Sequence, residues 1–288
     1  MSGICASCLD FDMNKIVKSK DSLAPKWLSE KDYVQEFIMK SKVFANYHPQ
    51  DFNVKMKLDI GKQHYGKKIL YWATKENNNN NNLSINDAKT SYGNFSNSGV
   101  ASVDKNGVVV LKFSCPQIYR TTPAYSSTPQ SYYRHLHFVI SNGEKDKWMG
   151  QIYTKIVVCK FGLKDSLQML KSGNYVFINA LPCESYGKDH IPNTYNLTHK
   201  QVKKMNQREL FEWFKKVVKL HYPNIHKEIT SKSINIKEIP IVAYCAHEKC
   251  NASELLLEEL LKKGMVNVYD YSGGMKEYRK SQINNKLF

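Results

Sequence analysis

The stretch YCAHEKCNAS at residues 244–253 decides the fold of the C-terminal half of the chain. An apolar run at residues 239–244 leads directly into Cys245 and is typical of a buried strand. Residues 252–263 have the pattern of a helix, and Gly264 is placed to end it. A strand, a short loop and a helix in this order indicate a parallel α/β sheet. The loop is therefore expected at the carboxyl end of a strand, where ligands bind in open α/β sheets.

Cys245 is the candidate nucleophile of this loop. Backbone N–H groups and the positive end of the following helix favour a thiolate or a bound anion. The alternative interpretation is a small buried apolar cysteine. Cys250 is predicted to be a second or resolving thiol, because neighbouring thiols can exchange a persulfide or form a reversible disulfide. The other residues of the predicted active-site loop are Ala246, His247, Glu248, Lys249 and Asn251.

The segments around this loop continue the α/β pattern. Residues 166–171 are predicted to form a helix ended by Gly173, and residues 207–221 to form a longer amphipathic helix. Short apolar runs at residues 175–178 and 266–269 indicate further strands. We therefore predict an α/β domain with a parallel sheet over residues 165–288.

Several motifs of this region resemble the rhodanese (sulfurtransferase) family. They are Val176-Phe-Ile-Asn-Ala, Asp189-His-Ile-Pro-Asn193 followed by Asn196-Leu197, Tyr244-Cys245, Gly264-Met-Val-Asn-Val268 and Gly273-Gly274. The resemblance implies a persulfide on Cys245 that is passed to an acceptor, with no cofactor. The loop lacks the family's Gly-x-Arg-Ser and has Cys250 where arginine is usual. The missing arginine also argues against a related Cys-x5-Arg phosphatase, which needs that bidentate donor.

The region before residue 163 has a β pattern. Residues 68–73, 108–113, 135–140 and 152–158 read as strands, and Asn106-Gly107 is typical of a tight turn. This spacing predicts a β-sandwich over residues 61–162. Residues 1–60 are predicted to be a partly helical extension, with a helix near 32–41. The asparagine run at 77–82 is predicted to be a surface insertion.

His135 and His137 are predicted to point to the same face of one strand, because side chains alternate along a strand. Two imidazoles on one face can bind a metal ion, and the alternative interpretation is an ordinary pair of strand histidines.

The surrounding sequence resembles the intradiol ring-cleavage dioxygenase family, whose members are non-haem iron(III) enzymes with a β-sandwich core. The matching stretches are Tyr71-Trp-Ala73, Ser102-Val-Asp-Lys-Asn-Gly107, Val110-Leu-Lys-Phe, Pro116-Gln-Ile-Tyr119, Arg134-His-Leu-His-Phe138 and Met149-Gly-Gln-Ile-Tyr153. The resemblance implies an Fe(III) site with Tyr119, His135 and His137 as ligands. The fourth ligand would be a second tyrosine, which in the family lies close before the first histidine. Tyr132 and Tyr133 are therefore candidates, and Tyr92 is a more distant one. The family's Arg-Pro-Ala spacer is lost here, so the fold and the metal could be retained without catechol cleavage.

Composition restricts the partners and the compartment. The chain has 288 residues, with 42 Lys and Arg against 26 Asp and Glu, which gives a formal net charge of +16. This charge favours anionic partners. We found no apolar run long enough to cross a bilayer and no secretory signal, so we expect a cytoplasmic protein whose seven cysteines are thiols. Cys5 and Cys8 form an isolated C-x-x-C that lacks a second pair of zinc ligands.

These observations lead to one main hypothesis and three alternatives. The main hypothesis is a rhodanese-like sulfurtransferase that takes sulfur from a small anionic donor and passes it to a thiol or protein acceptor. The first alternative is a non-catalytic interaction protein that retains both folds. The second is an iron-dependent dioxygenase with an accessory rhodanese domain. The third is an RNA- or tRNA-thiolation factor, although no nucleic-acid motif accompanies the positive charge.

Overall fold

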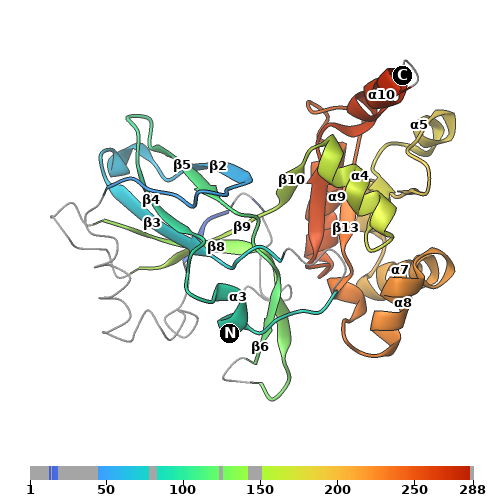
Figure 1. The fold of residues 1–288 in the computed structure, drawn as a ribbon, viewed down its shortest axis with the longest axis horizontal. Helices are drawn as coiled ribbons and strands as arrows, with labels where there is room; N and C mark the ends of the chain where they lie inside the picture. Colours follow the sequence, from blue (N-terminus) through green and yellow to red (C-terminus); the bar gives the residue numbers. More distant parts are fainter. Residues whose placement is uncertain are drawn as a thin grey trace. The chain divides into compact units, whose positions relative to one another are not determined.

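The computed structural model describes residues 13, 15–18, 45–77, 83–122, 126–141 and 151–285. The chain, drawn in Figure 1, divides into two compact units. Of the described residues, 83–85 and 158–285 belong to the second unit and the others to the first. The predicted helix at 32–41, Cys5, Cys8 and residues 78–82 of the asparagine run lie outside the described residues.

The N-terminal unit is built on an antiparallel sheet. Its five strands follow the order β1 (Val17–Lys18), β9 (Tyr153–Ile156), β8 (His135–Ile140), β3 (Lys68–Ala73) and β4 (Ser98–Ser102). Two further antiparallel pairs join β2 (Val54–Asp59) to β5 (Val108–Phe113) and β6 (Tyr119–Thr121) to β7 (Gln130–Tyr132). The short helices are η2 (Lys62–His64) and α3 (Ala88–Tyr92).

Strands β3 and β8 lie in the middle of the five-stranded sheet. Every residue of β8 is buried, as is every residue of β3 after Lys68, because both strands have neighbours on each side. Before β5, Gly107 has a φ of +82°, and the Asp104 carboxylate accepts hydrogen bonds from the N–H groups of Asn106 and Val108. The predicted turn chemistry is therefore present.

The C-terminal unit has a five-stranded sheet in which all pairs are parallel. The order is β10 (Cys159–Phe161), β14 (Val268–Tyr271), β13 (Ile241–Tyr244), β11 (Val176–Asn179) and β12 (Tyr195–Asn196). Its helices are α4 (Leu163–Ser172), α5 (Cys183–Lys188), α6 (His199–Lys204), α7 (Gln207–His221), α8 (Pro223–Thr230), η3 (Ile236–Glu238), α9 (Ala252–Lys262) and α10 (Gly274–Asn285). The α/β class with a parallel sheet is confirmed.

Side-chain alternation gives the two faces of this sheet different neighbours. Tyr244 and Tyr271 pack in one apolar cluster with Met169 of α4 and Met275 of α10. Because side chains alternate along a strand, the residue before each tyrosine points to the opposite face. Helix α9 contacts β13 and β14, and Asp270 therefore faces this helix.

Local signals in the sequence explain where the helices begin and end. Asn206 caps α7 by accepting a hydrogen bond from the N–H of Glu209, whose side chain bonds back to the Asn206 N–H. Gly173 ends α4 in the left-handed conformation, with a φ of +67°.

The divisions of the chain differ in two places from those expected from sequence. Strand β10 lies in the stretch assigned to the β domain, yet it pairs with β14 in the parallel sheet. Strand β2 lies in the stretch assigned to the extension, yet it pairs along its length with β5. Both are edge or peripheral strands whose partners are distant in sequence, so no local pattern indicates where they pair.

Candidate functional site

Cys245 directly follows β13, which lies in the middle of the parallel sheet. The preceding residue fixes its position, because the Tyr244 hydroxyl lies 2.7 Å from the Thr194 hydroxyl and accepts a hydrogen bond of 3.2 Å from the Ile191 N–H. Both partners are buried and follow α5. The segment that resembles the rhodanese signature therefore anchors the strand that carries Cys245.

The start of α10 holds the other side of the same loop. The N–H groups of Met275 and Lys276 donate hydrogen bonds of 2.9 Å to the carbonyl oxygens of Cys245 and Ala246. Gly274 makes this approach possible: its φ is +55°, and a Cβ atom here would lie 2.3 Å from the Cys245 carbonyl oxygen. The double glycine thus allows α10 to pack directly against the loop.

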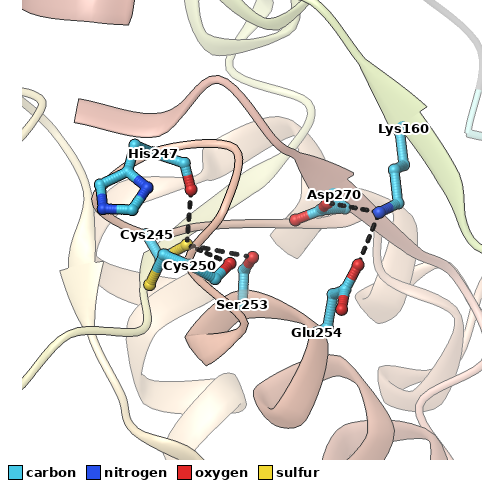
Figure 2. Close-up of polar contacts among 7 residues, drawn as sticks. All are labelled: Lys160, Cys245, His247, Cys250, Ser253, Glu254 and Asp270. Carbon is cyan, nitrogen blue, oxygen red and sulfur yellow. Dashed lines mark hydrogen bonds and ion pairs between the residues drawn. The ribbon is translucent and has the colours of Figure 1, made fainter. Parts of the chain in front are cut away.

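Cys245 is a buried free thiol with 1% of its surface exposed. Its Sγ lies 3.2 Å from the Cys250 carbonyl oxygen and 3.8 Å from that of His247 (Figure 2). The Ser253 hydroxyl donates to the same sulfur at 3.5 Å. Burial raises the pKa of Cys245, although the hydrogen bond from Ser253 lowers it in part.

Cys250 is a free thiol and is less buried than Cys245. Burial acts to raise its pKa, but hydrogen bonds from the backbone N–H groups of Ala252 and Ala246 outweigh this effect and hold the pKa below that of an ordinary cysteine. These donors lie in the loop and at the first residue of α9, where the helix dipole also favours an anion. The structure therefore makes Cys250 the more acidic thiol of the pair.

The tip of the loop is exposed to solvent at His247, Glu248 and Lys249. The Lys249 N–H donates to the Nδ1 atom of His247 at 3.3 Å, and the Cys250 N–H donates to the His247 carbonyl at 2.9 Å. Asn251 is the residue before α9. The tip approaches Cys245 through backbone carbonyls, which accept a thiol proton and do not stabilise a thiolate.

A polar network that sequence reasoning missed lies beside the loop. Asp270 of β14 is buried, and its Oδ2 atom lies 4.0 Å from Nζ of Lys160. Lys160 forms a closer pair, of 2.5 Å, with Glu254 of α9 (Figure 2). The available signal was a carboxylate inside an apolar strand, since Asp270 follows Val268-Tyr269 and precedes Tyr271.

The structure also brings together the four residues predicted to bind iron in the N-terminal unit. The Nε2 atom of His135 lies 3.1 Å from Nε2 of His137. The hydroxyls of Tyr92 and Tyr119 each lie 3.3 Å from the same His135 nitrogen. All four side chains are buried, and they come from α3, β6 and β8.

The two histidines are oriented through their other ring nitrogens. Nδ1 of His135 lies 2.7 Å from the Tyr133 carbonyl oxygen, which can only accept, so this nitrogen carries the proton. Nδ1 of His137 lies 2.8 Å from the Thr154 hydroxyl. The Nε2 lone pair of His135 therefore points into the cluster, as in histidines that bind metals.

Burial keeps all four groups uncharged in the absence of a cation. It lowers the pKa of His135 to about 4, and it lowers the pKa of His137 together with repulsion from His135. It raises the pKa of Tyr92 and of Tyr119. Two neutral imidazoles and two phenols that meet at one point fit a ferric ion, which favours phenolate oxygen and imidazole nitrogen.

Of the alternative tyrosines, Tyr132 stacks on Tyr119 with ring centroids 5.2 Å apart and an interplanar angle of 4°. Tyr133 contributes its backbone carbonyl to His135. Within the described ranges, no cluster of three or more His, Cys, Asp and Glu side chains could hold a metal ion. The Tyr and His cluster contains only two side chains of those types.

The remaining described cysteines differ from the prediction that all are thiols. Cys115 and Cys159 are disulfide-bonded, and for them the prediction is wrong. Cys183 is a free and exposed thiol at the start of α5. None of the helices in the described part of the chain is both long and apolar enough to span a membrane.

Comparison with known proteins identifies the class of the C-terminal unit. Residues 163–281 match the rhodanese-like domain family, so the chain contains a rhodanese-like domain. A search of curated protein sequences found no match. No comparison supports the intradiol-type β-sandwich predicted for residues 61–162.

Three solved structures illustrate the similarity. A human single-domain sulfurtransferase is 14% identical, with coverage of 43% of this chain and 97% of its own and a TM-score of 0.30. A Bacillus halodurans protein is 21% identical, with coverage of 43% and 73% and a TM-score of 0.30. An uncharacterized Saccharomyces cerevisiae protein is 14% identical, with coverage of 44% and 96% and a TM-score of 0.31.

Proposed function

We propose that the rhodanese-like domain is a sulfurtransferase that carries sulfur as a persulfide on Cys245. The observation that carries this proposal is the position of two free thiols, Cys245 and Cys250, in one loop at the carboxyl end of β13. Ligand sites of open α/β sheets form at this end of the strands. The loop is held by hydrogen bonds from α10, so its geometry is established before a donor binds.

The reaction has two steps. The Cys245 thiolate attacks the outer sulfur of a small anionic donor, which leaves as the anion with one sulfur fewer, and Cys245 becomes a persulfide. A thiolate of a small molecule or a protein then attacks the outer sulfur, which restores the Cys245 thiolate and forms a persulfide on the acceptor. No cofactor takes part. The positive charge of the chain favours anionic donors but selects none of them.

Cys250 is the second thiol of this mechanism. It is in hydrogen-bond contact with Cys245, and its lower pKa makes it a thiolate more readily. When no acceptor is present, the Cys250 thiolate attacks the inner sulfur of the Cys245 persulfide. This attack forms a Cys245–Cys250 disulfide and releases hydrosulfide, and an external dithiol then reduces the disulfide.

The test is a transfer assay on the full chain with thiosulfate or a small-molecule persulfide as donor and dithiothreitol as acceptor. We expect hydrosulfide release that Cys245→Ser abolishes. Cys183→Ser is the matched control, because it removes a free thiol far from the loop in sequence and should leave the rate unchanged. Full activity of Cys245→Ser would contradict the proposal.

The second candidate function is ferric iron binding in the N-terminal unit, and the convergence of four buried side chains favours it. Tyr92, Tyr119, His135 and His137 would hold the ion, and Thr154 would orient one imidazole. Bound iron would supply Lewis-acid and redox chemistry to an aromatic substrate, as the resemblance to intradiol dioxygenases implies. The intradiol-type sandwich and the dioxygenase activity belong to this same proposal.

The chain's own residues prepare the cluster for the ion. The low pKa of His135 keeps its Nε2 lone pair unprotonated at neutral pH, and each phenol must lose a proton when it binds a cation.

The test is absorption spectroscopy after addition of ferric iron. We expect a visible phenolate-to-iron band that Tyr119→Phe shifts or weakens. Tyr132→Phe is the control, because its ring stacks on Tyr119 but its hydroxyl is not among the four groups. The absence of a band and of bound iron would contradict this function.

The alternatives make different predictions for the same purified protein. A non-catalytic interaction protein would release no hydrosulfide and would form no persulfide. An RNA- or tRNA-thiolation factor would bind RNA with an affinity that falls steeply as salt rises. The absence of that dependence would remove this alternative. A cytoplasmic location is part of the main proposal.

A further inference from the structure

The two histidines of the Tyr and His cluster have different partners at Nδ1, the ring nitrogen that points away from the cluster. Nδ1 of His135 lies 2.7 Å from the Tyr133 carbonyl oxygen, and Nδ1 of His137 lies 2.8 Å from the Thr154 hydroxyl. A carbonyl oxygen can only accept a hydrogen bond, whereas a hydroxyl can donate or accept. The carbonyl therefore fixes the proton of His135 on Nδ1, and the hydroxyl allows His137 either position of its proton.

The strand register holds the Thr154 hydroxyl against His137. Thr154 lies on β9, directly opposite His137 of β8 in the antiparallel pairing. Side chains opposite each other on one face of a sheet lie close together. Thr154 is 2% exposed, and His135 and His137 are 4% and 5% exposed. The contact between hydroxyl and imidazole is therefore built into the sheet and shielded from water.

Inside the cluster, the Nε2 atoms of His135 and His137 face each other at 3.1 Å, which is a hydrogen-bond distance. Without a cation, one of the two nitrogens must carry a proton, because two facing lone pairs repel. Burial keeps both rings neutral, so each ring carries one proton. The proton of His135 is on Nδ1, so His137 must be the donor from Nε2. Nδ1 of His137 is then an acceptor, and the Thr154 hydroxyl must donate to it.

A bound cation requires the opposite arrangement at His137. A metal ion binds the lone pair of a neutral imidazole, so both Nε2 atoms must be unprotonated. His137 then carries its proton on Nδ1, and the Thr154 hydroxyl must accept it. His135 needs no change, because its Nε2 atom has a lone pair in both states.

We propose that Thr154 is a positioning residue that allows His137 to change tautomer when a ferric ion binds. This inference rests on the proposed iron site. In the change, His137 gives its Nε2 proton to water and takes a proton from water on Nδ1, so the ring stays neutral. The Thr154 hydroxyl rotates from donor to acceptor. The buried contact between Thr154 and His137 is therefore a hydrogen bond both with and without the ion.

The competing explanation makes Thr154 a permanent acceptor, with the His137 proton on Nδ1 in both states. Two lone pairs would then face each other at 3.1 Å without the ion. The hydroxyls of Tyr92 and Tyr119 would have to satisfy Nε2 of His135, and each lies 3.3 Å from it. A good hydroxyl hydrogen bond is shorter, at about 2.8 Å. The distances therefore favour His137 as the donor to His135.

The experiment is nitrogen NMR of isotopically labelled histidine side chains in the full chain, first treated with a chelator and then loaded with Ga(III). Gallium is diamagnetic and has the charge of the ferric ion. Protonated and unprotonated ring nitrogens have separate chemical shifts, and the His137→Gln variant assigns the signals. We expect the His137 proton on Nε2 in the chelated protein and on Nδ1 in the loaded protein. A proton on Nδ1 in the chelated protein, or on Nε2 in the loaded protein, would overturn the proposal.

Two substitutions of Thr154 test the hydroxyl itself. Thr154→Val preserves the branched shape and removes the hydroxyl, whereas Thr154→Ser retains the hydroxyl and is the matched control. The ion makes the Nδ1 proton of His137 a stronger donor, so the loss of its acceptor costs most in the loaded state. We expect Thr154→Val to bind gallium about 10- to 100-fold more weakly and Thr154→Ser to bind it like the wild type. Wild-type affinity of a Thr154→Val protein that urea titration shows to be folded would overturn the proposal.

The same samples separate this inference from the proposed iron site. Gallium binding with the His137 proton on Nδ1 in both samples would contradict the role of Thr154 and leave the metal site standing. Failure to bind gallium or ferric iron, with the His137 proton on Nε2 in the chelated protein, would contradict the iron site. The assignment of Thr154 as a donor to His137 in the ion-free protein would still hold in that case.

Discussion

Gly274→Ala tests the claim that α10 packs directly against the Cys245 loop. A Cβ atom at this position would lie 2.3 Å from the Cys245 carbonyl oxygen and 2.9 Å from its carbonyl carbon. Both atoms belong to the backbone, so the loop or the helix must move. The substitution also places alanine at a φ of +55°, which costs about 1–2 kcal/mol in a residue with a side chain.

Gly173→Ala provides the matched control for the backbone conformation. Gly173 has a φ of +67°, but a Cβ atom there would meet nothing within 4 Å. It therefore carries the same conformational cost without the collision. Overpacking adds about 1–3 kcal/mol in well-packed sites, so Gly274→Ala should destabilise the domain by that much more than Gly173→Ala.

The assay is hydrogen exchange of the full chain, followed in peptides from β13. Amides of a central strand open with the unfolding of the sheet, so their exchange rates report its stability. We expect exchange about 5- to 150-fold faster in Gly274→Ala than in Gly173→Ala. Gly274→Ala should also expose the buried Cys245 thiol to alkylation. Equal exchange rates in the two variants would refute the close approach of α10 to the loop.

Three further predictions concern the thiols and one helix. At pH 7 Cys250 should be alkylated faster than Cys245, because its lower pKa gives it more thiolate. The difference between the two alkylation rates should shrink as the pH rises above the pKa values of both thiols. Equal rates at pH 7 would contradict the assigned order of the two pKa values. A persulfide on Cys245 should decay to an intramolecular disulfide with release of hydrosulfide in the wild type, whereas Cys250→Ser should retain it, as intact-mass measurements over time would show. Asn206→Ala should remove the cap of α7 and lower the free energy of unfolding by about 1 kcal/mol in urea titrations, and an unchanged stability would contradict the role of the capping box.

Periodic segments and turn residues made much of the fold predictable. The strands at residues 68–73, 108–113 and 135–140 and the helix at 207–221 have the same bounds in the structure as in the sequence prediction. Their apolar spacing and their flanking turn or cap residues agree with one another, and local consistency of this kind specifies an element. The parallel sheet followed from the alternation of strands and helices.

The missed features depend on contacts between residues that are distant in sequence. The run at 266–269 was predicted to be the strand, whereas β14 spans Val268–Tyr271 and includes Asp270. Asp270 comes close to Ser253 and Lys160 only when β14, α9 and β10 pack together. The spacing of these residues in the sequence does not indicate that they are neighbours. The sequence also does not indicate that the pKa of Cys250 is lower than that of Cys245. The pKa of each thiol depends on which backbone N–H groups reach its sulfur.

The Tyr and His cluster shows what a motif can add to local patterns. Alternation along one strand placed His135 and His137 on one face, but it contained no information on Tyr92 or Tyr119. The resemblance to a known family supplied Tyr119 but left the second tyrosine open, with Tyr92 as the more distant candidate. The structure places the hydroxyls of Tyr92 and Tyr119 3.3 Å from Nε2 of His135.

Mass spectrometry of the persulfide tests the central claim most directly. The full chain is treated with one equivalent of a sulfane-sulfur donor, digested without reductant, and analysed for the peptide that contains both loop cysteines. The account predicts an added mass of about 32 Da, one sulfur atom, located on Cys245 and absent from Cys245→Ser. Consumption of the donor with the added mass on Cys183 or on no cysteine would contradict it.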